Sequence, residues 1–276
     1  MLLKKWIWTL ALIAPITWAQ TAPTGEVKGT ATVHTAESAR AVMEGAHLVL
    51  PVSVTGGAIY KGLLRDAPAQ VRERAPVVVF LHGSSGLGLK AIGEWQQWLA
   101  EMGIASVAPD SFALPDRITY KSPVSKDVYE KIHALRVSEI SLAVAAVSAA
   151  PWADAKRLVL AGTSEGATAV TRYKGSEFAG RMVFAWSCEN NYFVQSHDTA
   201  LPMDRPVLNI ISLSDPFFSP ANSWLGNPAA LGHCGATLKD NKQATIVLIA
   251  GAPHTLINLP AARYATAGFL RDVLKP

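Results

Sequence analysis

The sequence contains little charge and only two cysteines, Cys188 and Cys234. Charged residues make up 17% of the 276 residues and hydrophobic residues 50%, which excludes a disordered or fibrous chain. No basic stripe with interleaved aromatic residues occurs, so we expect no nucleic-acid partner. We also find no internal repeat, no low-complexity tract and no His/Cys cluster with the spacing of a structural zinc site.

The N-terminus has the pattern of a secretion signal. Residues 1–19 carry lysines at positions 4 and 5, continue with an apolar stretch too short to span a bilayer as a helix, and end with small residues at Thr17 and Ala19. This pattern predicts a signal peptide cleaved after Ala19 and a periplasmic or extracellular protein. An uncleaved N-terminal anchor is the alternative. No other stretch looks long and apolar enough to cross a membrane, so we expect no membrane partner after cleavage.

Removing residues 1–19 leaves 23 basic and 21 acidic residues, a net charge of +2 that demands no charged partner. Export would place Cys188 and Cys234 in an oxidising compartment, where an even number of cysteines favours a disulfide. The two positions lie 46 residues apart, and a bridge between them would contribute up to about 4 kcal/mol in the chain-entropy model. Two buried free thiols are the alternative.

The remaining chain alternates between strand-like and helix-like segments. Residues 20–40 are expected to form a loosely held leader, and residues 47–55 and 58–64 a hairpin around Gly56 and Gly57. Further strands are expected at 76–81, 104–107, 157–161, 182–186, 207–212 and 245–250, and helices at 89–102, 129–149, 164–173 and 259–274.

This alternation predicts the α/β fold class, a mostly parallel, doubly wound sheet with helices on both faces. Because no linker or charge run divides the chain, we expect a single domain over residues 20–276. Residues 111–131 form a long irregular insert in this reading, which we interpret as a cap over a site.

The segment Gly162-Thr163-Ser164-Glu165-Gly166 follows a predicted strand and opens a predicted helix. In that setting the serine sits on a sharp turn that projects its hydroxyl above the sheet, while the two glycines allow close packing. The motif therefore predicts that Ser164 is a nucleophile. The alternative is a serine that only caps the helix.

A serine nucleophile needs a base and an acid, and both are expected at later strand ends. His254 is the only histidine after the last predicted strand, and Asp215 follows the strand before it. The order Ser164, Asp215, His254 matches the chain order of a strand-turn-helix serine triad. Glu189, just beyond an earlier strand, is the alternative acid. The structural alternatives are that His254 is an ordinary surface histidine and that Asp215 only opens a turn.

Developing negative charge on the substrate oxygen requires preorganised donors. The strand ending at Leu81 runs into a Gly/Ser turn, and we expect the backbone amides of Ser84 and Glu165 to form the oxyanion hole. The Glu165 carboxylate would oppose the oxyanion unless it points away or is paired. His82 is interpreted as a hydrogen-bonding residue of the turn.

Together these motifs resemble the α/β-hydrolases, over roughly Val77 to the C-terminus. The chain most resembles the dienelactone-hydrolase-like branch, on the four motifs His82-Gly83-Ser84-Ser85-Gly86, Ala108-Pro109-Asp110, Gly162-Thr163-Ser164-Glu165-Gly166 and Gly251-Ala252-Pro253-His254. It has serine at position 164, where the namesake enzymes have cysteine. The resemblance implies an ester substrate rather than dienelactone itself, with no metal and no organic cofactor.

The leading hypothesis is an exported serine esterase that cleaves a small-molecule carboxylic ester through an acyl-enzyme. A catalytically silent binding protein on the same fold is one alternative. A dinucleotide-dependent oxidoreductase is another, because Gly83, Gly86 and Gly88 follow a strand, although in a spacing unlike the dinucleotide fingerprint. Trp186, Tyr192 and Phe193 lie near a strand end and either line an acyl pocket or pack in the core.

Overall fold

The computed structural model describes residues 24–275, so the predicted signal peptide at 1–19 lies outside the described residues. The strands are β1 (Val27–Lys28), β2 (His47–Leu50), β3 (Tyr60–Leu63), β4 (Ala75–Leu81), β5 (Ala105–Ala108), β6 (Thr119–Tyr120), β7 (Ala153–Thr163), β8 (Gly180–Phe184), β9 (Val207–Ser212) and β10 (Ala244–Ile249). The helices are α1 (Ala36–Glu44), α2 (Val52–Thr55), α3 (Lys90–Glu101), α4 (Lys126–Ala149), α5 (Glu165–Arg172) and α6 (Pro260–Val273), with short 3₁₀ turns η1 (Leu64–Asp66) and η2 (Ser111–Ala113).

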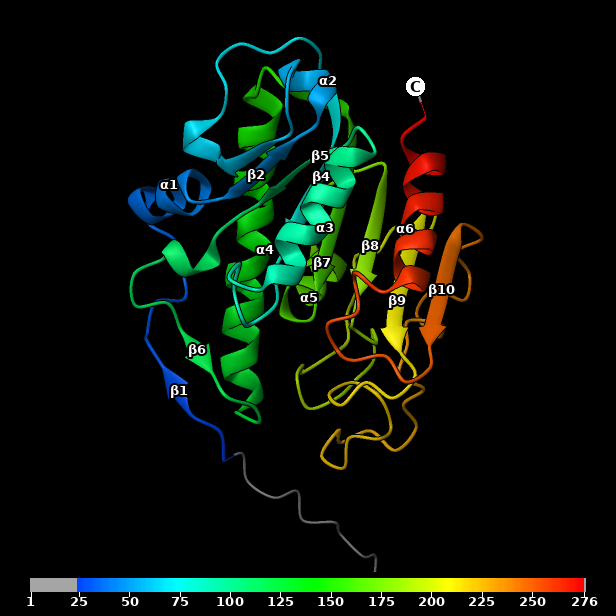
Figure 1. Ribbon diagram of the computed structural model, residues 1–276. Coiled ribbons are helices and arrows are strands. Elements are labelled where there is room, and N and C mark those ends of the chain that lie inside the picture. The colour runs from blue at the N-terminus through cyan, green and yellow to red at the C-terminus, as the bar shows by residue number, and fades with distance from the viewer. Residues whose placement is uncertain (1–23, 276) are drawn as a thin grey trace, which may run out of the picture.

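Eight of these strands form one twisted sheet in the order β10-β9-β8-β7-β4-β5-β2-β3 (Figure 1). All neighbouring pairs from β10 to β5 run parallel, whereas β2 is antiparallel to both β5 and β3. The prediction of a mostly parallel sheet with helices is therefore confirmed. The small pair β1 and β6 stands apart from this sheet.

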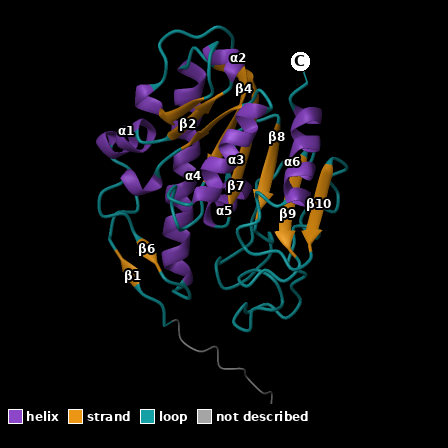
Figure 2. Cartoon of the chain, viewed as in Figure 1, coloured by secondary structure: helices purple, strands orange, loops and turns teal. Residues whose placement is uncertain are grey.

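Helices cover both faces of the sheet, as the layers in Figure 2 show. The helices α1, α4 and α5 share one hydrophobic core with the sheet, and α3 and α6 share the other. Val77 and Val79 of β4 belong to the first core, while Val78 and Phe80 belong to the second. Because alternate side chains of a strand point to opposite faces, a strand buried on both faces reads as a continuous apolar run.

The long helix α4 has the length and composition that could cross a membrane, contrary to the prediction that no segment beyond the N-terminus does. Its Tyr129 and Ile140 are fully buried against the sheet. Arg136 and Glu139 on the same helix are also fully buried, in an ion pair inside the fold. These contacts identify α4 as a core helix of this fold.

The predicted leader at residues 20–40 is wrong where the structure describes it. Residues 36–44 form α1, which begins at a capping box in which Thr35 and Ser38 exchange side-chain-to-backbone hydrogen bonds. The predicted strand 47–55 ends at Leu50, since Pro51 has no N–H to donate to a sheet. The antiparallel pairing of β2 with β3 is present, but α2 connects them instead of a two-residue turn.

The predicted irregular insert is partly ordered. Residues 111–131 contain η2, β6 and the first residues of α4, and β6 pairs with β1. Figure 1 shows this pair beside the lower end of α4, on the side of the molecule where the parallel strands end. The insert thus reaches the same edge as the loops that follow β8, β9 and β10.

Candidate active site

Ser164 occupies the sharp turn between β7 and α5. Its φ of 55° and ψ of −121° place it in a sparsely populated conformation that persists only where the surroundings enforce it. Its N–H donates to the Phe184 carbonyl on β8 (3.0 Å), and its carbonyl accepts from the N–H of Ala167 (3.0 Å). The hydroxyl makes no capping hydrogen bond to α5, so the helix-cap alternative is not what the structure shows.

Two glycines allow this turn to pack closely. A Cβ at Gly162 would lie 2.6 Å from the carbonyl oxygen of Gly166, and one at Gly166 would lie 2.3 Å from the carbonyl oxygen of Leu81. Both contacts are backbone contacts, which a side chain could not push aside. The glycines flanking Ser164 therefore hold the turn against β4 and the loop that follows it.

His254 and Asp215 form a hydrogen-bonded pair at the ends of neighbouring strands. Asp215 follows β9 by three residues and is fully buried, and its Oδ2 lies 2.7 Å from Nδ1 of His254. Its Oδ1 accepts from the backbone N–H groups of Phe217 (2.9 Å) and Phe218 (3.0 Å). This bond makes Nδ1 the donor, which leaves Nε2 of His254 free to take a proton.

The rival acid Glu189 is engaged elsewhere. Its two carboxylate oxygens accept from the backbone N–H groups of Leu231 (2.8 Å) and Gly232 (2.9 Å). Glu189 therefore stabilises the loop that contains these two residues. Among the described residues, Asp215 is the carboxylate that His254 contacts.

Of the two predicted oxyanion donors, Ser84 lines the same pocket as Ser164, and Glu165 follows Ser164 directly in the chain. Ser84 is exposed on the turn after β4, and in the described contacts its N–H has no protein acceptor. Glu165 is the first residue of α5, so its N–H has no acceptor within that helix. Backbone N–H groups that donate to no protein acceptor are available to donate to a substrate oxygen.

The Glu165 side chain is turned into a buried cluster of charges. Its Oε1 lies 2.6 Å from Nη2 of Arg117 and 3.5 Å from Nε of Arg136. Arg136 also donates to the His82 carbonyl (2.8 Å) and to Oε2 of Glu139 (2.6 Å). One guanidinium thus links the loop after β4 to the residue that follows Ser164. The Glu165 carboxylate is therefore paired with two arginines and does not oppose an oxyanion beside Ser164.

His82 contributes to this cluster as a neutral residue. Burial, reinforced by the charge of Arg136, lowers the pKa of His82 well below its usual value. Its Nδ1 donates to the Gly83 carbonyl (2.7 Å), and its Nε2 accepts from the N–H of Ser111 (3.2 Å). His82 therefore fixes the shape of the turn that presents Ser84.

We expect the variant Arg136→Met to be strongly destabilised, because it leaves the buried carboxylates of Glu139 and Glu165 short of a partner. The free energy of unfolding should fall by about 3–5 kcal/mol, measured by urea denaturation. The matched variant Arg157→Met removes a partly exposed pair with Asp154 and should cost less than about 1 kcal/mol. Equal losses in the two variants would contradict this account of the cluster.

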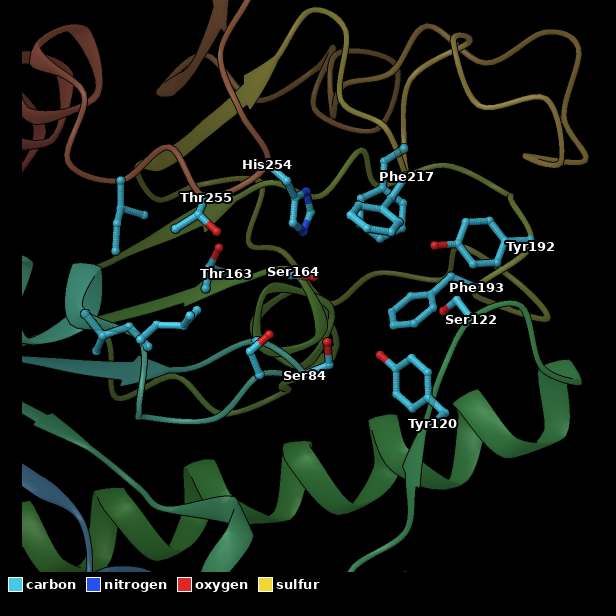
Figure 3. Close-up of a pocket in the computed structure, with 16 residues that line it drawn as sticks. Ser84, Tyr120, Ser122, Thr163, Ser164, Tyr192, Phe193, Phe217, His254 and Thr255 are labelled. Carbon is cyan, nitrogen blue, oxygen red and sulfur yellow. The ribbon is translucent and has the colours of Figure 1, made fainter. Parts of the chain in front are cut away.

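Ser164 and His254 line one pocket of about 150 Å³ (Figure 3). No hydrogen bond joins the two side chains in the described contacts, and such pairs commonly tighten only when substrate binds. Tyr192 and Phe193 line the pocket, which is one of the two alternatives that the sequence left open for them, and they also pack in the core. Trp186 does not line the pocket, because it packs behind the wall against Phe218, with ring centroids 4.8 Å apart.

Several lining residues were not anticipated from the sequence. They are Leu89, Ile92, Tyr120, Ser122, Phe217, Phe218, Thr255 and Ile257. Phe217 and Phe218 lie two and three residues after Asp215, and Tyr120 and Ser122 lie in the insert predicted to cap a site, so position along the chain offered a signal for these four. Within residues 24–275, no group of three or more His, Cys, Asp or Glu side chains is arranged to hold a metal ion.

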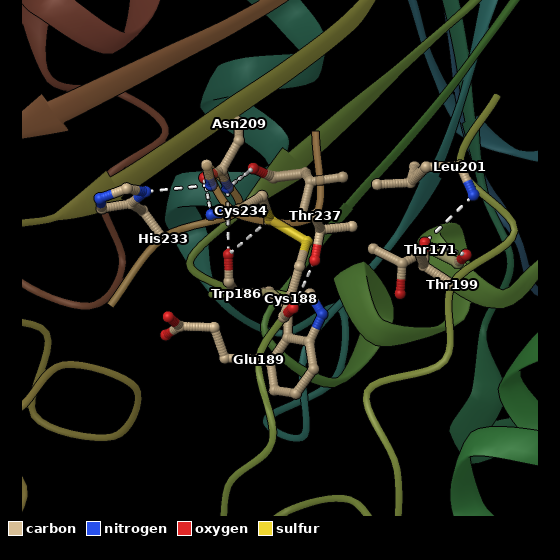
Figure 4. Close-up of a disulfide and its surroundings, with 12 residues drawn as sticks. Thr171, Trp186, Cys188, Glu189, Thr199, Leu201, Asn209, His233, Cys234 and Thr237 are labelled. Carbon is tan, nitrogen blue, oxygen red and sulfur yellow. Dashed lines mark hydrogen bonds between the residues drawn. A yellow bond between two sulfur atoms is a disulfide. The ribbon is translucent and has the colours of Figure 1, made fainter. Parts of the chain in front are cut away.

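Cys188 and Cys234 form a disulfide close to this site (Figure 4). Cys188 lies four residues beyond β8, and Cys234 lies in the long connection between β9 and β10 that also carries Asp215. Asn209 of β9 accepts from the N–H of Cys234 (3.0 Å), and Thr237 donates to the Cys188 carbonyl (2.9 Å). The bridge and these bonds hold that connection against β9 and against the segment that follows β8.

Reduction of this bridge is expected to lower the melting temperature and the catalytic rate together, since the connection that holds Asp215 loosens. The loss of stability should reach up to about 4 kcal/mol. Thermal unfolding and hydrolysis rates with and without reductant measure both effects. The Cys188→Ala/Cys234→Ala double variant is the control, which reductant should not change further. Two thiols titrating in unreduced, unfolded protein would contradict the bridge.

A mostly parallel sheet that presents a serine on a strand-turn-helix motif, followed in chain order by Asp and His at later strand ends, defines the α/β-hydrolase fold. Residues 62–267 match the model of the dienelactone hydrolase family, which is most of the chain. The chain therefore belongs to the dienelactone hydrolase family, as the resemblance predicted.

Solved structures share this fold at low sequence identity. Est1E from Butyrivibrio proteoclasticus is similar with a TM-score of 0.52 and 15% identity, over 83% of this chain and 94% of that one. A putative dienelactone hydrolase from Klebsiella pneumoniae subsp. pneumoniae is similar with a TM-score of 0.53 and 14% identity, over 82% and 98%. At such identities the likeness establishes the fold alone. A search of curated proteins finds no match to this chain.

Proposed function

We propose that the protein is a serine esterase that cleaves a small-molecule carboxylic ester through an acyl-enzyme. The observation that supports it most is the hydrogen bond of His254 to the buried Asp215, in the pocket that also holds Ser164. Asp215 orients the imidazole and stabilises its cationic form, which is what a base serving a serine needs. Membership of a hydrolase family supports the same reaction class.

In the proposed first half-reaction, Oγ of Ser164 attacks the ester carbonyl carbon while Nε2 of His254 takes the hydroxyl proton. The carbonyl oxygen becomes an oxyanion, which the N–H groups of Ser84 and Glu165 stabilise. The C–O bond to the alcohol then breaks, and His254 passes its proton to the departing alkoxide. The products are the free alcohol and an ester of Ser164.

In the second half-reaction, water attacks the acyl-enzyme and His254 accepts its proton. Collapse of the second tetrahedral intermediate releases the carboxylic acid and returns the proton to Ser164. No metal or organic cofactor takes part in either half. The buried partners of Glu165, Arg117 and Arg136, keep its carboxylate away from the oxyanion at each stage.

Small-molecule ligands are consistent with this proposal. Est1E, which has a similar fold, has been solved with ferulic acid bound. The 150 Å³ pocket beside Ser164 suits a small group better than a folded protein chain.

A panel of p-nitrophenyl esters of increasing acyl length tests the proposed activity. We expect hydrolysis with a burst of p-nitrophenol when deacylation is slower than acylation. Short acyl groups should be favoured, because the pocket is small. A purified, folded protein that cleaves no ester in the panel would instead favour a silent binding protein on this fold.

We also propose that the protein is exported and acts outside the cytoplasm as a single domain from Gln20 onward. The basic, apolar and small-residue pattern of residues 1–19 supports this proposal, and so does the disulfide between Cys188 and Cys234. N-terminal sequencing of protein recovered from expressing cells should begin at Gln20. A mature chain that still begins at Met1 would overturn the proposal.

A further inference from the structure

The wall of the Ser164 pocket carries no fixed charge. Of the described residues that line it, none is Lys, Arg, Asp or Glu, and His254 is the one histidine among them. The rest are aromatic, aliphatic, hydroxyl-bearing or glycine residues. A substrate group that enters this pocket therefore loses its contact with water and gains no contact with a Lys or Arg side chain of the wall.

One half of the pocket is built from aromatic rings. Tyr192, Phe193 and Phe218 pack against one another with ring centroids 5.6 to 6.1 Å apart, and Tyr120 lies 6.0 Å from Phe193. Phe217 lies 4.7 Å from the ring of His254 and joins this half to the catalytic pair. Aromatic rings favour such edge-to-face and offset contacts with a further ring.

Hydroxyl groups accompany these rings. Figure 3 shows the hydroxyl oxygens of Tyr120 and Tyr192 pointing toward the side of Ser164, and the hydroxyl of Ser122 beside the ring of Phe193. Burial, together with the nearby Glu165 carboxylate, raises the pKa of Tyr120 well above its usual value. Burial also raises the pKa of Tyr192, with the nearby Tyr129 adding to the effect. Both phenols thus remain neutral hydrogen-bonding groups.

Two buried carboxylates, those of Asp215 and Glu165, lie behind the residues that line the pocket. Asp215 contacts His254 and lies close enough to Tyr192 to act on its titration, and Glu165 does the same for Tyr120. Arg117 and Arg136 are occupied by Glu165, Glu139 and backbone carbonyls, and both are buried. The four charges of that cluster cancel, so it offers no free cation to a substrate.

We infer that the pocket selects uncharged esters carrying a flat ring and rejects esters whose ring carries a carboxylate. The inference rests on the proposed esterase activity and adds the substrate class. A pocket of about 150 Å³ has the volume that holds one benzene ring. The ring fills the aromatic half, and its neutral oxygen or nitrogen substituents meet the three hydroxyl groups. A carboxylate on the ring would leave water without a cation to pair with and would come near the buried Asp215.

Matched esters test the charge selectivity on the unmodified protein. Methyl 4-carbamoylbenzoate and monomethyl terephthalate have nearly the same shape, but only the second carries a carboxylate. We expect kcat/KM to be roughly 100-fold or more higher for the carbamoyl ester. The pair 4-acetoxybenzamide and 4-acetoxybenzoate places the same groups on the alcohol side, so the two pairs show which side of the ester enters the aromatic half.

The ring preference is tested by the ratio of kcat/KM for methyl benzoate to that for methyl butanoate. Phe193→Leu should lower this ratio by roughly 2- to 10-fold, because one aromatic contact is lost. Phe178→Leu makes the same change in the core, away from the pocket, and should leave the ratio unchanged.

The outcomes separate this inference from the proposed function. If no ester in any pair is cleaved, the esterase proposal itself fails. If esters are cleaved but the carboxylate-bearing member of both pairs is used as well as its neutral partner, the activity stands and the charge selectivity is wrong. A ratio of methyl benzoate to methyl butanoate that is unaffected by Phe193→Leu would overturn the ring assignment.

Discussion

Replacing Ser164 by alanine, or His254 by alanine, should lower kcat for ester hydrolysis by about 10³-fold or more while the protein stays folded. Ser164 supplies the attacking oxygen in this account, and His254 carries its proton in both half-reactions. The two losses should not add in the double variant, since the residues act as one unit. Steady-state rates, with circular dichroism to verify folding, measure the effect.

Matched controls keep this result specific. Ser176→Ala and His197→Ala change the same residue types at exposed positions away from the pocket and should leave the rate unchanged. If Ser164→Ala or His254→Ala instead retained near-normal rates after purification, the assignment of nucleophile and base would be wrong.

Asp215→Asn should reduce kcat by about 10⁴-fold, the second large effect. An asparagine can still accept from the N–H groups of Phe217 and Phe218 through its carbonyl oxygen. Its amide, however, presents a donor to Nδ1 of His254, which then becomes the acceptor. The proton moves to Nε2, so the imidazole can no longer take one from Ser164.

Glu189→Gln is the matching test of the rival acid. Glu189 holds the N–H groups of Leu231 and Gly232, so this variant should lose stability in that loop but keep most of its activity. A severe loss of kcat in Glu189→Gln combined with a mild loss in Asp215→Asn would move the acid to the end of β8. The comparison therefore decides between the two carboxylates by kinetics rather than by position.

The central sheet could be predicted from the sequence because its strands are buried on both faces. The run Val77-Val78-Val79-Phe80-Leu81 has no polar residue, which is typical of a parallel strand between two helical layers. The N-terminal region could not be predicted as well. The helix α1 has mixed composition, and its start depends on the hydrogen bonds between Thr35 and Ser38.

The positions of Ser164, Asp215 and His254 in the site could be anticipated because parallel strands end at a common edge. Residues that follow such strands come together whatever their separation in sequence. The pocket wall could not be anticipated in the same way. Tyr120 and Ser122 reach it from an irregular insert, whose path depends on packing against the rest of the molecule.

The buried charges gave the weakest sequence signal. Arg136 and Glu139 interrupt the apolar face of α4 at a spacing that is also common on exposed helix surfaces. Only the fold reveals that Arg117 and Glu165, distant in sequence, complete the cluster. Long-range pairing of this kind is set by tertiary contacts, and local pattern does not encode it.

Labelling with a fluorophosphonate tests the central claim, that Ser164 is the activated nucleophile, most directly. The reagent phosphonylates a serine only where a base and an oxyanion hole activate it. Intact-mass spectrometry should show stoichiometric labelling of the wild-type protein, peptide mapping should place it on Ser164, and Ser164→Ala should not be labelled. Ester hydrolysis at full rate without labelling, or labelling on another residue, would contradict the account.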